Sequence, residues 1–291
     1  MEYTIEKDNS TSKILYIIGN GFDLAHKIKS SYYDFKEWCI KNSVGLQLDF
    51  LLNPNADWSD IEESLGKDKN ENHIYENIDP YDGDYRSQNP FKVSNVIEDS
   101  VEFLFEETMK FLKPAFRDWV NSIDINNVEY KNKYDLEPDS FYLTFNYTET
   151  LEEFYNIHSE QICHIHGSRL EKKDKYVFGH NNNRNVIVCN KGNMMDWEIK
   201  AKKEIIEFMN NFEKPYNKCK IKLENFIKNK NIEKIIVYGH SLGEVDWPYF
   251  EKIIEIIGDD IPWEVNCYDP KDKVRMQQFK QNFGLKNIKA I

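Results

Sequence analysis

The sequence predicts an α/β protein with a Rossmann-like, mostly parallel sheet, flanking helices and a helical insertion. Short apolar runs rich in Ile, Val, Tyr and Phe alternate with longer segments whose apolar residues recur every three to four positions. The first run ends abruptly in glycine, which is typical of a buried parallel strand followed by a turn. With 40 % apolar and 14 % aromatic residues among 291, the chain can fill a core of this kind.

The predicted strands are short. The first occupies residues 13–18, Lys-Ile-Leu-Tyr-Ile-Ile, directly before Gly19. Further strands are predicted at residues 141–144, 161–164, 175–178, 234–238 and 264–268, and a short final one from residue 288. Helices are predicted at residues 31–40, 93–120, 149–155, 197–228, 247–257 and 271–283. Strands that alternate with helices form βαβ units, so we expect right-handed crossovers.

These elements predict a single domain over residues 1–291. Its sheet core combines residues 11–30 with residues 138–291, and the helical insertion occupies residues 31–137. Within the insertion, residues 66–90 contain many Asn, Asp, Gly, Pro and Tyr and almost no aliphatic residues. We interpret this stretch as a long loop that covers or borders the functional site.

Charge and composition restrict the partners. A net charge of −12 works against the neutralisation of phosphates, so nucleic acid is disfavoured. A small-molecule nucleotide or a protein, including a second copy of the chain in a homo-oligomer, fits better. No apolar run approaches the roughly 20 residues of a membrane span, and the start lacks a signal-peptide h-region, so we expect a cytoplasmic protein. The five cysteines are scattered without a C-x-x-C pair, which disfavours disulfides and structural zinc.

The first candidate site is the turn Gly19-Asn20-Gly21-Phe22-Asp23, which follows the first strand. Glycines at 19 and 21 let the backbone turn tightly and approach a phosphate, and the next helix would present its N-terminal N–H groups to the anion. Leu24 stands where G-x-G-x-x-G has its third glycine. An ordinary βα turn is the alternative.

The second candidate follows the strand at residues 141–144. Ligands of open α/β sheets collect at the carboxyl ends of strands, so Thr144 and Asn146 are placed to reach a sugar or an amide group. The alternative is that Asn146 and Thr148 only cap the turn and the helix after it.

The third candidate is His164-Ile165-His166-Gly167, at the end of another strand. Alternation points both histidines to the same face, and a histidine that titrates near neutral pH is a natural general base at a sugar hydroxyl. No Asp/Glu/His cluster completes a metal site around them, so no metal is expected. For His164 a hydrogen-bonded core role is the alternative, and His166 is the stronger functional candidate.

The fourth candidate is the late loop that contains Gly239, Ser241, Gly243 and Asp246. Its glycines and serine match the G-x-S-x-G elbow of α/β-hydrolases. A serine hydrolase also needs a later histidine, and none follows His240. We therefore favour a loop that contacts a ligand over a nucleophile elbow.

A cluster of carboxylates beside a tryptophan is a secondary candidate. It includes Trp58, Asp60 and Glu62. The alternative is a solvated cap at a helix start, where the helix dipole favours negative charge.

Together and in this order, five segments resemble the AbiH family of bacterial phage-defence proteins. They are IIGNGFDLAH with SYYDF after it, DWSDIEESL, LTFNYTETLE, HIHGS and VYGHSLGEVDWPYF, and they span residues 14–250. The family is associated with abortive infection, in which an infected bacterium halts its own growth before the phage replicates. The resemblance implies a phage protein as the trigger.

The AbiH family is also similar to sirtuin-like NAD-binding domains, which implies a sirtuin-like core and NAD as substrate or ligand. This similarity implies that Asn146 lies at the nicotinamide ribose and that His166 acts as the general base. The residues implied to lie along or beside the dinucleotide are Gly19, Asn20, Gly21, Phe22, Asp23, Thr144, Gly167, Gly239, Ser241 and Asp246.

Two departures from the sirtuin pattern restrict the activity that the resemblance implies. Sirtuin deacetylases have an aspartate where Thr148 stands, and a four-cysteine zinc module that is missing here, so a zinc-dependent lysine deacetylase is not expected. The resemblance favours an NAD glycohydrolase, which hydrolyses NAD to nicotinamide and ADP-ribose. Asp23 or a carboxylate of the cluster from Asp60 to Glu63 would then lie near the developing positive charge. The alternative is a non-catalytic sensor of NAD or an ADP-ribose-type nucleotide that acts through a partner protein.

Overall fold

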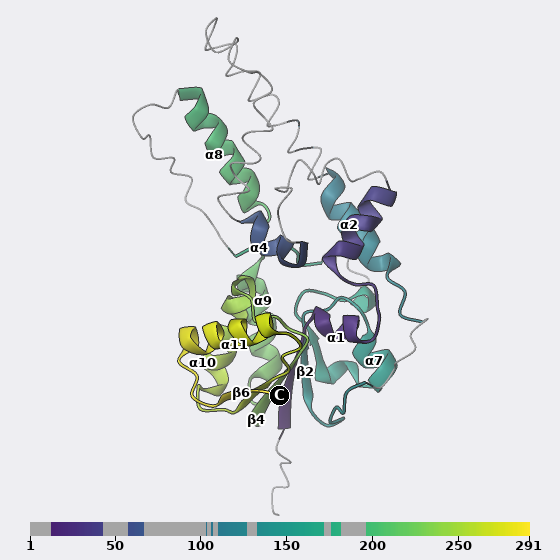
Figure 1. Cartoon of the computed structure of the whole chain (residues 1–291), viewed down its shortest axis with the longest axis vertical. Coiled ribbons are helices and arrows are strands. Elements are labelled where there is room, and N and C mark those ends of the chain that lie inside the picture. Colours follow the sequence, from purple (N-terminus) through teal and green to yellow (C-terminus); the bar gives the residue numbers. More distant parts are fainter. Residues whose placement is uncertain are drawn as a thin grey trace, which may run out of the picture.

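The computed structural model describes residues 13–42, 58–66, 103, 106, 110–126, 133–171, 176–181 and 196–291. These residues contain a six-stranded sheet in the order β3-β2-β1-β4-β5-β6, and all neighbouring strands are parallel (Figure 1). The strands are β1 (Lys13–Ile18), β2 (Phe141–Thr144), β3 (Ile162–His164), β4 (Ile232–Tyr238), β5 (Trp263–Val265) and β6 (Ile288–Ala290). The predicted α/β class with a parallel sheet is confirmed.

Helices surround the sheet. They are α1 (Asn20–Ala25), α2 (Tyr32–Lys41), α4 (Ile61–Leu65), α7 (Thr150–Tyr155), α8 (Asp196–Asn210), α9 (Tyr216–Ile227), α10 (Trp247–Ile257) and α11 (Pro270–Phe283). Residues 110–122 are helical too. Short 3₁₀ turns are η1 (Trp58–Asp60), η2 (Ser159–Gln161), η3 (Arg169–Glu171) and η4 (Glu244–Asp246). None of the helices in the described ranges is long and apolar enough to cross a membrane.

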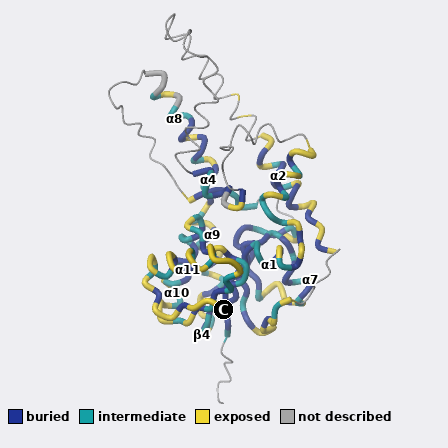
Figure 2. The backbone as a smooth tube through the Cα atoms, viewed as in Figure 1, coloured by how far each residue is buried: buried dark blue, intermediate teal, exposed yellow. Residues whose placement is uncertain are grey.

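Strand β1 is buried on both faces. Leu15 and Ile17 project to the face that α9, α10 and α11 cover. Tyr16 and Ile18 project to the opposite face, which α1 and α7 cover. Burial on both faces explains why the strand is a continuous apolar run rather than an alternating one. Figure 2 shows this buried centre in dark blue beneath the largely exposed outer faces of the helices.

A second layer of helices lies beyond the end of the sheet where α1 begins (Figure 1). Helices α2, α4 and α8 and the helix at residues 110–122 share one apolar cluster. Its centre is aromatic, since the ring of Phe35 lies 5.1 Å from that of Trp119 and the ring of Phe116 lies 4.6 Å from that of Phe178. These helices cover the carboxyl edge of the sheet, where the candidate site lies.

Two predicted elements were wrong. The predicted strand at residues 175–178 is not a strand where it is described: Val177 donates one backbone hydrogen bond to His166, and Phe178 packs into the helical cluster instead of extending the sheet. The predicted helix at residues 197–228 is two helices: α8 ends at Asn210 in a turn, and α9 begins directly after Pro215, a residue type that disfavours a helix running through it. The rest of the predicted helix at 93–120 and residues 67–90 of the predicted loop lie outside the described residues.

Candidate site at the carboxyl edge of the sheet

Four neighbouring strands end at one level. Ile18 is in register with Thr144 on one side and with Tyr238 on the other, and Thr144 is in register with His164. One or two positions beyond these ends lie Gly19, Asn146, His166 and Gly239. The register of the parallel strands thus brings these four residues to one edge of the sheet. Their roles toward a ligand stay predictions.

The turn after β1 interlocks with the loop after β4. Gly19 N–H donates to the Tyr238 carbonyl at 3.0 Å, and Gly21 N–H donates to the Gly239 carbonyl at 2.8 Å. A Cβ at residue 19 would lie 2.5 Å from the Cα of His240, and one at residue 21 would lie 2.8 Å from the Cα of Gly239. The close approach that these two glycines permit is therefore to the protein's own backbone.

The other residues of this turn also have protein partners. The Asn20 side-chain oxygen accepts a 2.6 Å hydrogen bond from the Ser30 hydroxyl. Phe22 is fully buried, and its ring stacks on Tyr134 at 4.9 Å. Of the predicted dinucleotide contacts, Phe22 thus faces the core, and its backbone N–H bonds to the Gly19 carbonyl.

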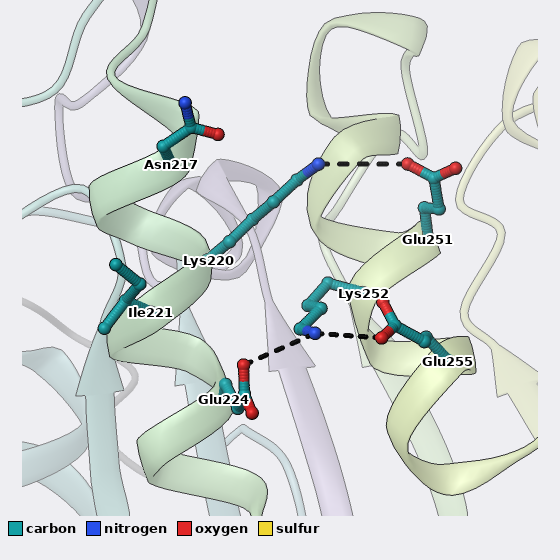
Figure 3. Close-up of a pocket in the computed structure, with 7 residues that line it drawn as sticks. All are labelled: Asn217, Lys220, Ile221, Glu224, Glu251, Lys252 and Glu255. Atoms are coloured by element: carbon teal, nitrogen blue, oxygen red, sulfur yellow. Dashed lines mark hydrogen bonds and ion pairs between the residues drawn. The ribbon is translucent and has the colours of Figure 1, made fainter.

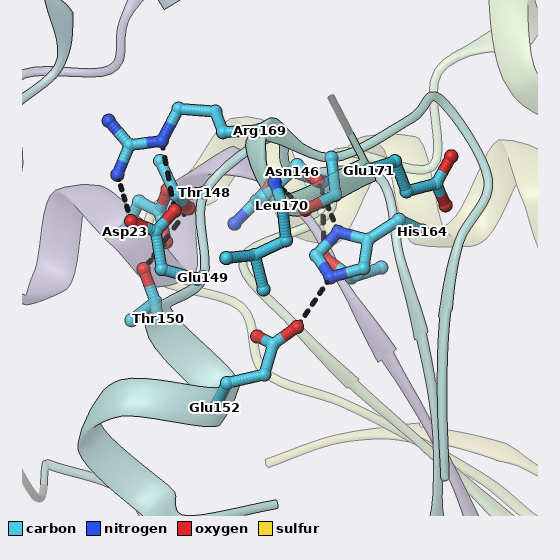
Figure 4. Close-up of polar contacts among 12 residues, drawn as sticks. Asp23, Asn146, Thr148, Glu149, Thr150, Glu152, His164, Arg169, Leu170 and Glu171 are labelled. Carbon is cyan, nitrogen blue, oxygen red and sulfur yellow. Dashed lines mark hydrogen bonds and ion pairs between the residues drawn. The ribbon is translucent and has the colours of Figure 1, made fainter. Parts of the chain in front are cut away.

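Asp23 forms a compact polar group with the start of α7. Its two carboxylate oxygens accept hydrogen bonds from Thr148, at 2.5 Å, and Thr150, at 2.9 Å (Figure 4). Burial raises the pKa of Asp23 to about 6, against the lowering effect of hydrogen bonds from Thr148, Thr150 and Asn146. Thr148 therefore binds a carboxylate of its own chain, in addition to any capping role.

His164 and Asn146 bind one another. Nδ1 of His164 lies 3.1 Å from the Asn146 carbonyl, and its Nε2 lies 2.9 Å from Glu152 Oε1 (Figure 4). Both ring nitrogens are engaged, which favours the core role for His164. Asn146 itself is 6 % exposed, and its backbone N–H donates to the Thr144 hydroxyl at 3.1 Å.

His166 differs from His164. It is 3 % exposed, and its ring lies between those of Phe145, at 5.1 Å, and Tyr249, at 5.6 Å. Its Nε2 is buried and has no hydrogen-bond partner among the residues that the structure describes. Burial lowers the pKa of His166 well below its ordinary value, and the nearby Lys214 ammonium lowers it further. The ring is therefore neutral near pH 7, with an unpaired nitrogen.

A buried ion-pair network lies beside His166. The ammonium of Lys214 is completely buried and lies 2.9 Å from Asp246 Oδ1 and 3.2 Å from Glu62 Oε2. Burial alone would lower the pKa of Lys214, but the two carboxylates raise it overall. Burial raises the pKa of Asp246, but Lys214, His240 and His166 together lower it overall. We call Glu62, Lys214 and Asp246 the Lys214 network.

The network joins distant parts of the chain. Glu62 in α4 also accepts a 3.0 Å hydrogen bond from the backbone of Gly179. Asp246 ends η4, just before α10. Of its members, Glu62 and Asp246 were predicted as site residues and Lys214 was missed, as was His240 beside the network. Lys214 fell within the predicted helix at residues 197–228, and the signal that sets it apart is the proline directly after it.

His240 completes the surroundings of Asp246. Its Nδ1 accepts a 3.0 Å hydrogen bond from the Leu242 N–H, so the proton of the neutral ring is on Nε2. That Nε2 lies 3.4 Å from Asp246 Oδ2. Asp246 thus faces Lys214 with one oxygen and His240 with the other.

The remaining predicted residues are Ser241, Gly167, Trp58 and Asp60. Ser241 is exposed, and Gly167 has a positive φ of 94° at the turn after β3. Trp58 is buried, with the Lys36 ammonium 5.0 Å from its ring centre. Asp60 ends η1, and its side chain lies outside what the structure describes.

No group of three or more His, Cys, Asp or Glu able to hold a metal ion occurs in the described part of the chain. A surface groove of about 300 Å³ lies between α9 and α10, crossed by ion pairs such as Lys220 with Glu251 at 3.8 Å (Figure 3). It contains none of the predicted site residues, and exposed ion pairs of this kind contribute little to stability.

Residues 15–267 match a family model described as Bacteriophage abortive infection AbiH. The match covers more than half of the chain and contains every predicted site residue as well as Lys214 and His240. Comparisons with curated proteins and with solved structures find no match.

Proposed function

The chain belongs to the family of bacteriophage abortive infection proteins AbiH, and from this premise we propose that it binds NAD at the carboxyl edge of its sheet and hydrolyses it to nicotinamide and ADP-ribose. The observation that carries the proposal is the neutral, buried His166, whose Nε2 has no hydrogen-bond partner in the described residues. Buried polar atoms are rarely left unpaired, so such an atom at the ligand-binding edge of an α/β sheet favours a site.

In the proposed reaction, the bond between C1′ of the ribose and the nicotinamide nitrogen breaks, and its electron pair leaves with nicotinamide. Water then forms the new bond to C1′ and releases a proton. His166 Nε2 accepts that proton or a hydrogen bond from a ribose hydroxyl. Asn146 orients the ribose, because its side-chain nitrogen is held by the Gly19 carbonyl at 3.2 Å.

The charges at the carboxyl edge of the sheet suit the proposed hydrolysis of NAD. The transition state has a cation-like ribose, and two carboxylates, Glu62 and Asp246, share the single ammonium of Lys214. Preorganised charge in a buried site acts strongly on charge that develops during the reaction. The phosphates need donors outside the β1 turn, since Gly21 and Phe22 donate to the protein; we assign the adenosine half to the β4 loop, where Ser241 is exposed.

One observation favours the second candidate, a sensor of NAD or an ADP-ribose-type nucleotide. Asn146 and His166 are 6 % and 3 % exposed, so a ligand must displace covering segments to reach them. A rearrangement driven by binding is the means by which a non-catalytic sensor would signal to a partner protein.

Nicotinamide release by the purified protein tests the proposal. The assay is run with NAD alone and with extract from phage-infected cells, together with a calorimetric measurement of NAD affinity on the same preparation. Release above background supports the hydrolase. Tight binding without release under both conditions would leave the sensor, and absence of both binding and release would reject NAD as the ligand.

A further inference from the structure

Asp246 is held on both of its carboxylate oxygens. Lys214 lies 2.9 Å from Oδ1, and His240 Nε2 lies 3.4 Å from Oδ2. His166 Nε2 lies 3.8 Å from the same Oδ1, which is too long for a hydrogen bond. This carboxylate beside His166 is thus already bound by other donors.

The lysine is held as firmly as the carboxylate. Its ammonium is completely buried between Asp246 and Glu62, and Glu62 is fixed in turn by the Gly179 N–H. The backbone of Lys214 donates to the His180 carbonyl at 3.0 Å. An ammonium anchored in this way cannot turn away from Asp246 without leaving a buried charge unpaired.

We propose that Lys214 is a positioning residue of the site: it keeps Asp246 turned toward itself and His240, and so leaves Nε2 of His166 without a protein partner and available to the ligand. The proposal rests on the proposed function for the identity of that ligand. Its geometric part, the competition between Lys214 and His166 for Asp246, holds for any ligand at this edge.

The charges around His166 predict the direction in which its pKa changes when Lys214 or Asp246 is removed. Burial lowers the pKa of His166 most, Lys214 lowers it next, and Asp246 acts in the opposite direction. Removal of Lys214 would delete a repelling positive charge and release Asp246, so both effects favour protonation of His166. Removal of the Asp246 charge would have the opposite effect. The groups that face His166 are Lys214 and Lys222 on the α9 side, Asp246 in η4, His240 after β4, and the phenols of Tyr147 and Tyr249.

The test is an NMR titration of the histidine side chains, which needs no turnover. The His166 signals are assigned by their loss in His166→Ala. We expect His166 to stay neutral throughout the pH range in which the wild type is folded, and to become protonated within that range in Lys214→Met. It should stay neutral in Asp246→Asn and in Lys214→Arg, which keeps the charge.

Lys214→Met leaves two buried carboxylates, so it can fail to fold. Lys214→Met with Glu62→Gln removes one negative charge together with the positive one and keeps the shapes similar. His166 should titrate in this double variant as well. The proposal would be overturned if His166 remained neutral in the folded double variant. It would also be overturned if His166 titrated in Lys214→Arg as it does in Lys214→Met.

The activity assay separates this inference from the proposed function. If nicotinamide is released, the acid limb of the pH profile of kcat/KM should move to higher pH in the lysine-free variant, because His166 must be neutral to act as base. If His166 titrates as expected but the protein releases no nicotinamide, the proposed hydrolase activity is rejected and the positioning role of Lys214 is retained. Nicotinamide release with an unchanged pH profile would reject the role of Lys214 alone.

Discussion

The side-chain nitrogen of Asn146 donates a 3.2 Å hydrogen bond to the carbonyl oxygen of Gly19. A second bond from the same amide reaches Asp23, whose pKa it lowers against the effect of burial. With its nitrogen committed to β1 and α1, the amide oxygen of Asn146 has a set direction. It is the acceptor that this residue can offer to a ribose hydroxyl.

His166→Ala is expected to lower NAD turnover by a factor of about 100 or more, the usual scale for loss of a general base. NAD affinity should fall much less, because the alanine removes the proton acceptor and leaves Asn146 in place. The measurement pairs nicotinamide release with calorimetry on the same preparations.

His158→Ala is the matched control and should behave as wild type, since His158 is exposed and precedes β3, whereas His166 is buried and follows it. If His166→Ala and Asn146→Ala change affinity while turnover stays at background in all proteins, the sensor is the better description.

Gly239→Ala is expected to destabilise the fold by about 2–5 kcal/mol. Its φ is +66°, which costs a side chain about 1–2 kcal/mol, and its Cβ would lie 2.0 Å from the nitrogen of Phe22, an overlap that costs about 1–3 kcal/mol more. Gly284→Ala is the control, because φ there is +65° with nothing within 4 Å. Urea unfolding compares the two.

Equal losses of stability in these two variants would show that the interlock of the β1 turn and the β4 loop contributes nothing. The same geometry affects Gly21→Val, a natural choice for blocking a phosphate. Because its side chain would meet the backbone of Gly239, that variant tests folding rather than phosphate binding.

Asp23 should make the protein less stable as pH rises. Its pKa in the folded state is raised from 3.8 to about 6, so the folded state holds the proton that the unfolded state has lost. The contribution to the free energy of unfolding therefore decreases between about pH 4 and about pH 6, by about 3 kcal/mol in total, and is level outside that window.

The difference in stability between wild type and Asp23→Asn isolates this effect, since Asp246 and other groups titrate alike in both proteins. Denaturant unfolding at a series of pH values gives that difference. A difference that is constant from pH 4 to pH 7 would contradict the raised pKa.

Arg169→Lys is expected to cost about 1–3 kcal/mol of stability. Two nitrogens of the guanidinium bind the carboxylate of Glu149, Nε at 2.9 Å, and a third bonds to the Ile123 carbonyl. Lysine cannot reproduce this planar, bidentate contact. In Arg117→Lys the ion pair with Asp118 is exposed, so the loss should be near zero. Thermal unfolding of both variants provides the comparison, and equal losses would argue against a structural role for the Glu149 contact.

The sheet and its edge could be predicted because they depend on local patterns. A buried apolar run that ends in glycine, as residues 14–19 do, specifies a strand and the place where it stops. Parallel strands stop at a common edge, so the residues after β2 and β3, Asn146 and His166, were predicted together. The run at residues 175–178 was misassigned because a short apolar segment has the same periodicity whether it pairs in a sheet or packs against helices.

Local sequence therefore specified the elements, their α/β class and the residues that follow each strand, because propensity and periodicity act within a few positions along the chain. The strand order β3-β2-β1-β4-β5-β6 depended on the tertiary structure. So did the partners of the glycines, which meet backbone rather than open space. Lys214 shows the reason most clearly: its burial depends on Glu62 and Asp246, which are 152 and 32 residues away in the chain. A charged side chain is buried only where folding brings such partners to it, and no local pattern records that.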